Sequence, residues 1–403
     1  MFKSTAKKLF LGMPLVFIFI FFFAIEWRWE AMLLGLPDIK PHVIAAVLST
    51  VVALSGFSRL REKGISYLII LLLICYYIGV SVLNIGTLSN TPDYNLMTEF
   101  GVWCINLALF VAASNQKIWE YIYRHSLTVM ILYMLFVLPL FFLLWYSGCA
   151  VESNFNLRNA IFISGLAQNS NYIVSYQSIG DKLSLLTFIV LSLNLEKRFK
   201  FVILVITMCA LFIVGSKASM VGYIFACVIY YFMHLWLNKR YLKCTLIIIV
   251  SICLSCGGLI YIVGNTSLQN SSNWLISTLA RGNDDVSVSG RHLIEEENQE
   301  TRGSRILLGD YKFDSKLGRP GTYSHSALGL IDYYGLFIFV IVTGIWFYLL
   351  FKLLFVVNRT PIVQATLMSM LFYTLLFTIA RFPNGYLTFW VLGMATCAAS
   401  RQT

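Results

Sequence analysis

Three basic side chains lie where apolar sequence is interrupted. Lys217 stands in the short polar break Gly-Ser-Lys-Ala-Ser, Arg291 follows a Ser-Gly pair in a long polar segment, and His325 comes just before the chain turns apolar again. A cation at such a boundary is costly without an anionic partner, and converging Lys, Arg and His side chains are suited to phosphate-type groups. If the fold brings these residues together, they predict a site for an anionic group such as a lipid diphosphate.

Each of these residues also has an ordinary interpretation. Lys217 could extend its ammonium group to a membrane interface, and Arg291 has the i,i+4 spacing to Glu295 of an ion pair on an exposed helix. His325 alone is compatible with the start of a helix.

Two aspartates fall within or near apolar sequence. Asp181 and Asp332 are ionisable residues in such segments, which indicates function by default. Asp181 could, however, simply neutralise the adjacent Lys182.

The composition places all of these residues in a helical membrane protein. Of 403 residues, 58% are hydrophobic and 12% are charged, and the mean hydropathy is +0.76. A soluble domain needs roughly 25% charged residues, whereas about 20 apolar residues cross a bilayer as a helix. The runs are apolar on all faces and lack the alternation of membrane barrel strands. The sequence therefore predicts an all-α polytopic membrane protein.

We expect about twelve transmembrane helices. The predicted spans are residues 9–25, 42–57, 66–84, 97–113, 127–147, 171–194, 201–214, 218–237, 244–264, 326–351, 361–380 and 386–400. Most lysines and arginines of the short connections fall on the side that also carries both termini, and basic connections face the cytoplasm. Both termini are therefore expected in the cytoplasm, and the three basic residues at the outer face.

One connection, residues 265–325, is longer and more polar than the others and is expected on the outer side. It separates a membrane part with nine spans, 1–264, from one with three, 326–403. Long loops between spans commonly carry function. The absence of Pro and strong turn residues after Gly290 favours a short helix over about 291–302.

The motifs of many soluble enzymes are absent. No G-x-G-x-x-G, P-loop, H-E-x-x-H or G-x-S-x-G pattern occurs, and no Asp-x-Asp pair suggests a divalent metal. The nine cysteines are scattered, which does not indicate a disulfide framework. We therefore expect no metal, no cofactor, no nucleic-acid partner and no ATP-driven pumping by this chain alone.

Four short sequence elements follow one another in a recognisable order. Residues 163–171 (ISGLAQNSN) are similar to a G-x-x-x-N-x-N element before a span, and residues 215–222 to a Ser-Arg-small element. Residues 289–291 and then 325–336 are similar to Gly-Arg and His-Asn-x-x-L…Gly-Leu elements. Together these elements resemble those of the O-antigen polymerase and O-antigen ligase superfamily of bacterial inner membranes, and the resemblance covers about residues 160–340.

Two positions depart from the family pattern. Lys217 stands where Arg is usual, so the charge is kept while the planar bidentate fork is lost. Ser326 replaces the usual Asn. Lysine at position 217 slightly favours a polymerase over a ligase.

The resemblance implies a metal-independent glycosyltransferase of the multi-span C-type fold, with its active site at the periplasmic face of the bacterial inner membrane. Such a polymerase moves the growing glycan from undecaprenyl diphosphate onto the next lipid-linked repeat unit, among membrane lipids and with a chain-length regulator as partner. Lys217 and Arg291 would bind the diphosphate, and His325 the acceptor hydroxyl or the donor phosphate, as a candidate base. Further substrate contacts are expected from Arg158, Asn171, Arg281, Arg302, Arg305 and Arg319.

Other functions stay open at this point. An O-antigen ligase would use the same donor but transfer it to lipid A core. A lipid-linked oligosaccharide flippase would show polar residues along a central cavity and short loops on both sides, which the long outer loop argues against. A structural or regulatory membrane protein would explain the spans but not the basic residues.

Overall fold

A computed structural model of the chain describes residues 64–84, 96–146, 176–240, 286–316, 326–357, 359–381 and 385–400, together with Leu242 and Pro383. Every regular element in this part is helical, and none of these residues lies in a strand. The helices are α4 (Gly64–Leu83), α6 (Leu96–Ala113), α7 (Gln116–Arg124), α8 (Ser126–Tyr146), α10 (Tyr176–Ser192), α11 (Lys197–Val214), α12 (Lys217–Leu237), α15 (Val286–Arg305), α16 (Phe313–Lys316), α17 (Gly329–Leu354), α18 (Pro361–Ile379) and α19 (Tyr386–Ser400). The all-α prediction is confirmed for this part of the chain.

Long apolar helices identify the protein as one suited to a membrane. Within the described residues, α12, α17 and α18 are long and apolar enough to cross a bilayer, and α7 with α8 would add a span bent by 84°. The other predicted spans in this part fall on α4, α6, α10, α11 and α19, which do not reach that length and hydropathy, so their crossing of a membrane stays a prediction. The predicted spans 9–25, 42–57 and 244–264 lie outside the described residues.

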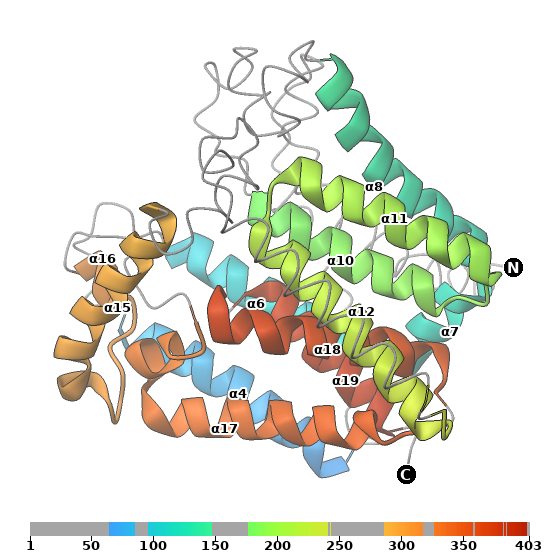
Figure 1. Ribbon diagram of the computed structural model, residues 1–403. Helices are drawn as coiled ribbons and strands as arrows, with labels where there is room; N and C mark the ends of the chain where they lie inside the picture. Colours follow the sequence, from blue (N-terminus) through green and yellow to red (C-terminus); the bar gives the residue numbers. More distant parts are fainter. Residues whose placement is uncertain are drawn as a thin grey trace, which may run out of the picture.

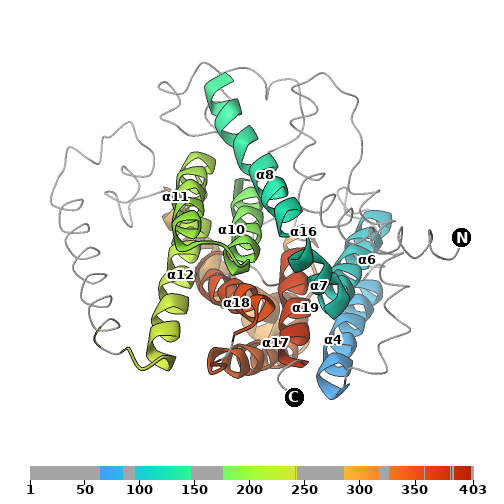
Figure 2. The same cartoon turned by 90° about the vertical axis from the view of Figure 1, so that its right-hand side faces the viewer.

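The hairpin of α18 and α19 forms the centre of the described bundle. In Figure 2, α10, α11 and α12 lie on one side of it and α4 and α6 on the other. In α18, 72% of the apolar stretch is buried, against 22% in α12. A helix that is apolar all round and buried belongs in a core, whereas a helix with exposed apolar residues is suited to face lipid.

Small residues and hydroxyl groups allow these helices to pack closely. A Cβ atom at Gly393 would lie 2.5 Å from the carbonyl oxygen of Phe110, so α19 and α6 approach only because position 393 has no side chain. The Thr207 hydroxyl of α11 lies 2.7 Å from the Tyr133 hydroxyl of α8 and 3.1 Å from the Thr187 hydroxyl of α10. These bonds join three helices without exposing polar groups to lipid.

The connection between predicted spans 97–113 and 127–147 is itself a helix, α7, which the sequence did not predict. Asn115 caps it by accepting a hydrogen bond from the Lys117 backbone N–H. Ile118, Trp119 and Ile122 are buried on one face, with charged residues on the other. Nine residues with so strong an apolar stripe fold as a surface helix rather than as an irregular loop.

The long polar segment contains the predicted helix. The observed α15 runs from 286 to 305, which is longer at both ends than the expected 291–302. It packs against α17, as Figure 1 shows at the edge of the bundle. The helix therefore lies on the membrane part of the protein.

Candidate functional site

Three chain segments meet around the first turns of α10. Two of them are the break between α11 and α12 and the connection between α18 and α19, and the third segment is the start of α10; these helices pack side by side (Figure 1). The group of residues Asp181, Lys182, Ser216, Lys217, Ser219 and Arg381 at this point is called the Asp181 cluster below.

An aspartate on α10 and an arginine after α18 form the centre of the Asp181 cluster. Arg381 Nε donates to Asp181 Oδ2 at 2.8 Å, and Arg381 Nη2 donates to Asp181 Oδ1 at 3.1 Å. The two side chains are only 12% and 6% exposed. A two-point contact between a fork and a carboxylate is geometrically specific, and burying it couples the helices that carry it.

The first turn of α12 is tied to the same carboxylate. The Ser219 hydroxyl donates to Asp181 Oδ1 at 2.6 Å, and the Ser216 hydroxyl lies 2.6 Å from that of Ser219. Ser216 and Ser219 are both buried. Lys217 lies between these two serines in sequence, so its backbone is held on both sides.

Gly180 is what lets α10 approach this turn. A Cβ atom at position 180 would lie 2.7 Å from the Ser219 hydroxyl oxygen and 2.9 Å from the Ser216 Cβ. Any larger residue would push α12 away from α10, because such contacts are shorter than side chains tolerate. The close packing and the Ser219–Asp181 bond therefore depend on this glycine.

A second cation of the Asp181 cluster is fully buried. Lys182 is 0% exposed, and its ammonium nitrogen lies 5.5 Å from the centre of the Tyr386 ring. The Tyr386 hydroxyl in turn lies 2.8 Å from the hydroxyl of Ser178. The Asp181 cluster as defined thus contains one carboxylate and three cationic residues.

The chain that follows His325 returns to the bundle beside α18. The Ala327 backbone N–H donates to the Phe377 carbonyl at 2.6 Å, four residues before Arg381. Ser326 accepts a hydrogen bond from the Leu328 N–H through its hydroxyl at 3.3 Å. The segment carrying the predicted His element therefore begins its helix next to the connection that supplies Arg381.

A second buried aspartate joins α15 to α17. Arg302 Nε donates to Asp332 Oδ1 at 2.8 Å, its Nη2 donates to Glu295 at 2.9 Å, and Arg305 Nη2 lies 4.0 Å from Asp332. Hydrogen bonding to Asp332 raises the pKa of Arg302, whereas burial lowers the pKa of Arg305. Glu295, Arg302, Arg305 and Asp332, called the Asp332 cluster below, hold two acids and two bases.

The turn after α15 fits a break in α17. Gly335 has φ 85° and ψ 168° inside α17, and a Cβ there would collide with the backbone of Leu307. The Leu336 N–H donates to the Ile306 carbonyl at 2.7 Å, and the Asp310 N–H donates to the Asp332 carbonyl at 2.8 Å. Gly335 and Leu336, the Gly-Leu pair of the sequence motif, are thus the residues of α17 against which this turn packs.

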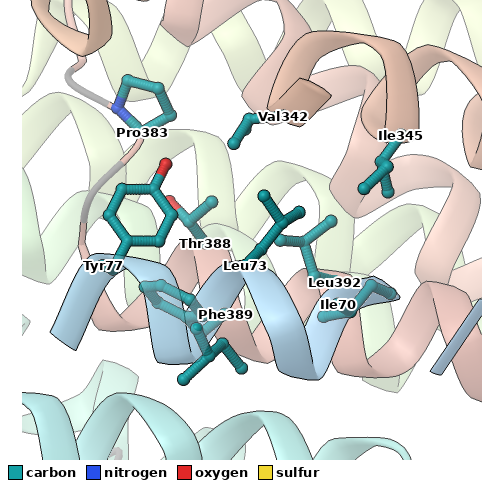
Figure 3. Close-up of a pocket in the computed structure, with 10 residues that line it drawn as sticks. Ile70, Leu73, Tyr77, Val342, Ile345, Pro383, Thr388, Phe389 and Leu392 are labelled. Carbon is teal, nitrogen blue, oxygen red and sulfur yellow. The ribbon is translucent and has the colours of Figure 1, made fainter. Parts of the chain in front are cut away.

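A small apolar pocket lies between α4, α17 and α19 (Figure 3). Its walls are Ile70, Leu73, Ile74, Tyr77, Val342, Ile345, Pro383, Thr388, Phe389 and Leu392. No charged residue lines it, so it does not fit the head group of a charged substrate.

The described part of the chain contains some of the predicted site residues. Lys217 begins α12 in the Asp181 cluster, and Arg302 and Arg305 belong to the Asp332 cluster. His325, Arg158, Asn171, Arg281 and Arg319 lie outside the described residues, so their roles stay predictions.

Arg291 is described in its backbone only. It lies within α15, and Glu295, Asn298 and Arg302 follow it by four, seven and eleven positions. This spacing places the backbone of residue 291 on the same stripe of the helix as those three residues. Asn298 is buried and Arg302 pairs with α17. The helix thus sets position 291 on the stripe that faces the bundle.

Sequence reasoning missed the central role of Arg381. The sequence offered only the adjacent Lys182 as a residue that Asp181 could neutralise. The only available signal was a single arginine in a short connection between two apolar runs. Its partner stands 200 residues earlier in the chain.

In the part of the chain with described placement, no three or more His, Cys, Asp or Glu side chains gather as a metal site would require. The chain matches no protein-family model and no curated protein.

Proposed function

We propose that this protein is a bacterial inner-membrane glycosyltransferase that polymerises glycan from a lipid diphosphate donor, as an O-antigen polymerase does. The observation that carries the proposal is the Asp181 cluster, where Arg381 pairs with a buried carboxylate and Lys182 and Lys217 stand on the two helices that meet there. Such a group of cations suits a substrate whose reacting bond ends in a diphosphate.

The arrangement of helix ends supports this proposal. Arg381 Nη2 lies 3.4 Å from the hydroxyl of Ser219, two residues after Lys217, and the chain from Ser326 onward starts α17 beside the same connection. The twelve-span topology of the sequence analysis puts these helix ends on the periplasmic side, with both termini in the cytoplasm. The donor's diphosphate would be presented at that face.

In the proposed reaction the hydroxyl of the acceptor repeat unit attacks the anomeric carbon of the donor glycan. The bond from that carbon to the diphosphate oxygen breaks, and undecaprenyl diphosphate leaves. Lys217 and Arg291 stabilise the charge that develops on the leaving diphosphate, in place of a metal ion. His325 accepts the proton of the acceptor hydroxyl.

The ligase alternative shares the donor site and differs in the acceptor. The flippase alternative predicts short loops on both sides of the membrane, which the long polar connection 265–325 argues against. We therefore favour group transfer over flipping and retain the ligase as the second candidate.

Deleting the gene in its host and examining surface glycan by gel tests the proposal. Core carrying a single repeat unit supports the polymerase. Core without any repeat, together with accumulated long lipid-linked polymer, identifies a ligase instead. Unpolymerised repeat on the cytoplasmic side identifies a flippase.

Complementation with variants tests the residues. Arg291→Ala and His325→Ala are expected to abolish polymer while the protein still inserts in the membrane, and Lys217→Arg to retain most activity because the charge is kept. Normal polymer with Arg291→Ala would rule out the diphosphate role of Arg291.

A further inference from the structure

We propose that Ser219 is a positioning residue that fixes Lys217 for the donor diphosphate, with Asp181 and Arg381 as its anchor. This inference rests on the proposed function, because it needs Lys217 to bind the diphosphate. It adds a role for three residues that the sequence motifs did not assign.

The hydrogen bonds run in one direction toward the carboxylate. A serine hydroxyl has one proton, and that of Ser219 goes to Asp181 Oδ1 at 2.6 Å. The contact of 2.6 Å between Ser216 and Ser219 is therefore donated by Ser216. Asp181 in turn is held by Arg381 at two points.

This chain of bonds grips the residues on both sides of Lys217. Ser216 precedes it by one position and Ser219 follows it by two, and both are buried. A lysine side chain has four rotatable bonds, so its ammonium group reaches one place reproducibly only if its backbone is fixed. Fixing the backbone before substrate arrives lowers the entropy cost of binding.

The hydroxyl of Ser219 differs from those of other buried serines in the bundle. Ser184 and Ser369 are equally buried, yet their hydroxyls donate to carbonyls of their own helices at 2.8 Å. Such bonds are the ordinary way in which a serine is accommodated in an apolar helix. Ser219 instead donates to a charged group on another helix, and Gly180 keeps that helix close enough.

The experiment measures the affinity of the full chain in lipid nanodiscs for farnesyl diphosphate by calorimetry, with farnesol to correct for binding of the tail. The variants are Ser219→Ala, Lys217→Gln and the double variant. Ser219→Cys, which keeps the size of the side chain but donates weakly, is included in case the alanine variant does not fold. Ser369→Ala is the matched control for loss of a buried serine hydroxyl.

We expect Ser219→Ala to weaken binding about fivefold to tenfold and Lys217→Gln at least about tenfold. The double variant should bind about as weakly as Lys217→Gln alone, because Ser219 acts through Lys217. Ser369→Ala should bind as wild type does. A purely structural role of Ser219 predicts instead that the two losses multiply.

The outcomes separate this inference from the proposed function. If Lys217→Gln weakens binding but Ser219→Ala does not, or if the two losses multiply, the positioning role is wrong and the diphosphate site stands. If wild type does not bind the probe, or Lys217→Gln binds it unchanged, the diphosphate role of Lys217 is wrong and the inference falls with it.

Discussion

The protein contains two buried aspartate–arginine clusters that differ in what surrounds them. In the Asp332 cluster two acids face two arginines, and α15 is joined to α17 across 30 residues of sequence. The Asp181 cluster has one carboxylate, which pairs with Arg381 from 200 residues further along the chain, and two further cations, Lys182 and Lys217. Balanced charge suits a joint between two elements, whereas an excess of cations suits binding of an anion.

This difference bears on Arg302 and Arg305, which the resemblance suggested as further contacts for the substrate. Arg302 already donates to Asp332 and Glu295, and Arg305 lies 3.9 Å over the Phe313 ring. A diphosphate would have to compete with these contacts. We therefore infer that Arg302 and Arg305 serve first to dock α15 on α17. Substrate contact by these two arginines stays a prediction.

The largest expected effect comes from breaking the Asp181 cluster. Asp181→Ala leaves Arg381 buried without its carboxylate and should cost about 3–5 kcal/mol of unfolding free energy. Thermal unfolding in detergent measures this. The apolar double variant Asp181→Leu with Arg381→Met should recover most of that stability, because it removes both charges, yet it should lose affinity for the diphosphate probe. A loss below about 1 kcal/mol in Asp181→Ala would show that the pair is not a joint of the bundle.

Breaking the Asp332 cluster should instead act locally. Asp332→Ala leaves Arg302 and Arg305 without their shared carboxylate, and both can turn to solvent once α15 undocks, so we expect a loss of about 2–3 kcal/mol. Limited proteolysis should cut within residues 286–316 while the helical bundle stays intact. Glu300→Gln, at an exposed position on α15, is the control. Unfolding of the whole bundle in Asp332→Ala would erase the distinction between the two clusters.

A glycine substitution tests the place on α17 where the turn after α15 packs. Gly335→Ala forces a side chain into a backbone of φ 85° against Leu307, and should cost about 1–3 kcal/mol. Gly344→Ala on the same helix has open space around its new Cβ and should be neutral or slightly stabilising. Chemical denaturation of the two variants side by side measures the difference. Equal stabilities would mean that the turn does not depend on this break in α17.

The smallest effect is expected at the rim of the Asp332 cluster. Glu295 is 27% exposed, so its ion pair with Arg302 is partly screened by solvent, and Glu295→Gln should cost only about 0.5 kcal/mol. Hydrogen exchange of the α15 amides, at low and high salt, measures this. A loss as large as that of Asp332→Ala would show that the glutamate, rather than the aspartate, holds α15.

Local sequence predicted the helices well because their signal is local. Apolar runs placed α12, α17 and α18 within a few residues of their observed bounds, since a helix that long and apolar has no other way to satisfy its backbone in a membrane. The short helix α7 was missed because its signal is a stripe of three apolar residues among charged ones. A search for amphipathic stripes in the connections would have found it.

The pairing of Asp181 could not be predicted in this way. Adjacent side chains on a helix point about 100° apart, so Lys182 and Asp181 do not face each other. Any other cation of the chain was therefore a candidate partner for the Asp181 carboxylate. Only packing of α10 against α18 selects Arg381. The same packing also selects Ser219, which no sequence motif singles out.

Composition and hydropathy were enough to predict the helices of the described part, several of them long and apolar enough to span a membrane, and the basic residues at polar breaks, because these patterns act over a single helix. Tertiary structure alone decided which of those charges meet. Gly180 and the α18–α19 connection bring Ser219 and Arg381 to Asp181, and Gly335 seats the turn that docks α15. Contacts between helices depend on side-chain size and register at distant positions, and these become defined only when the bundle packs.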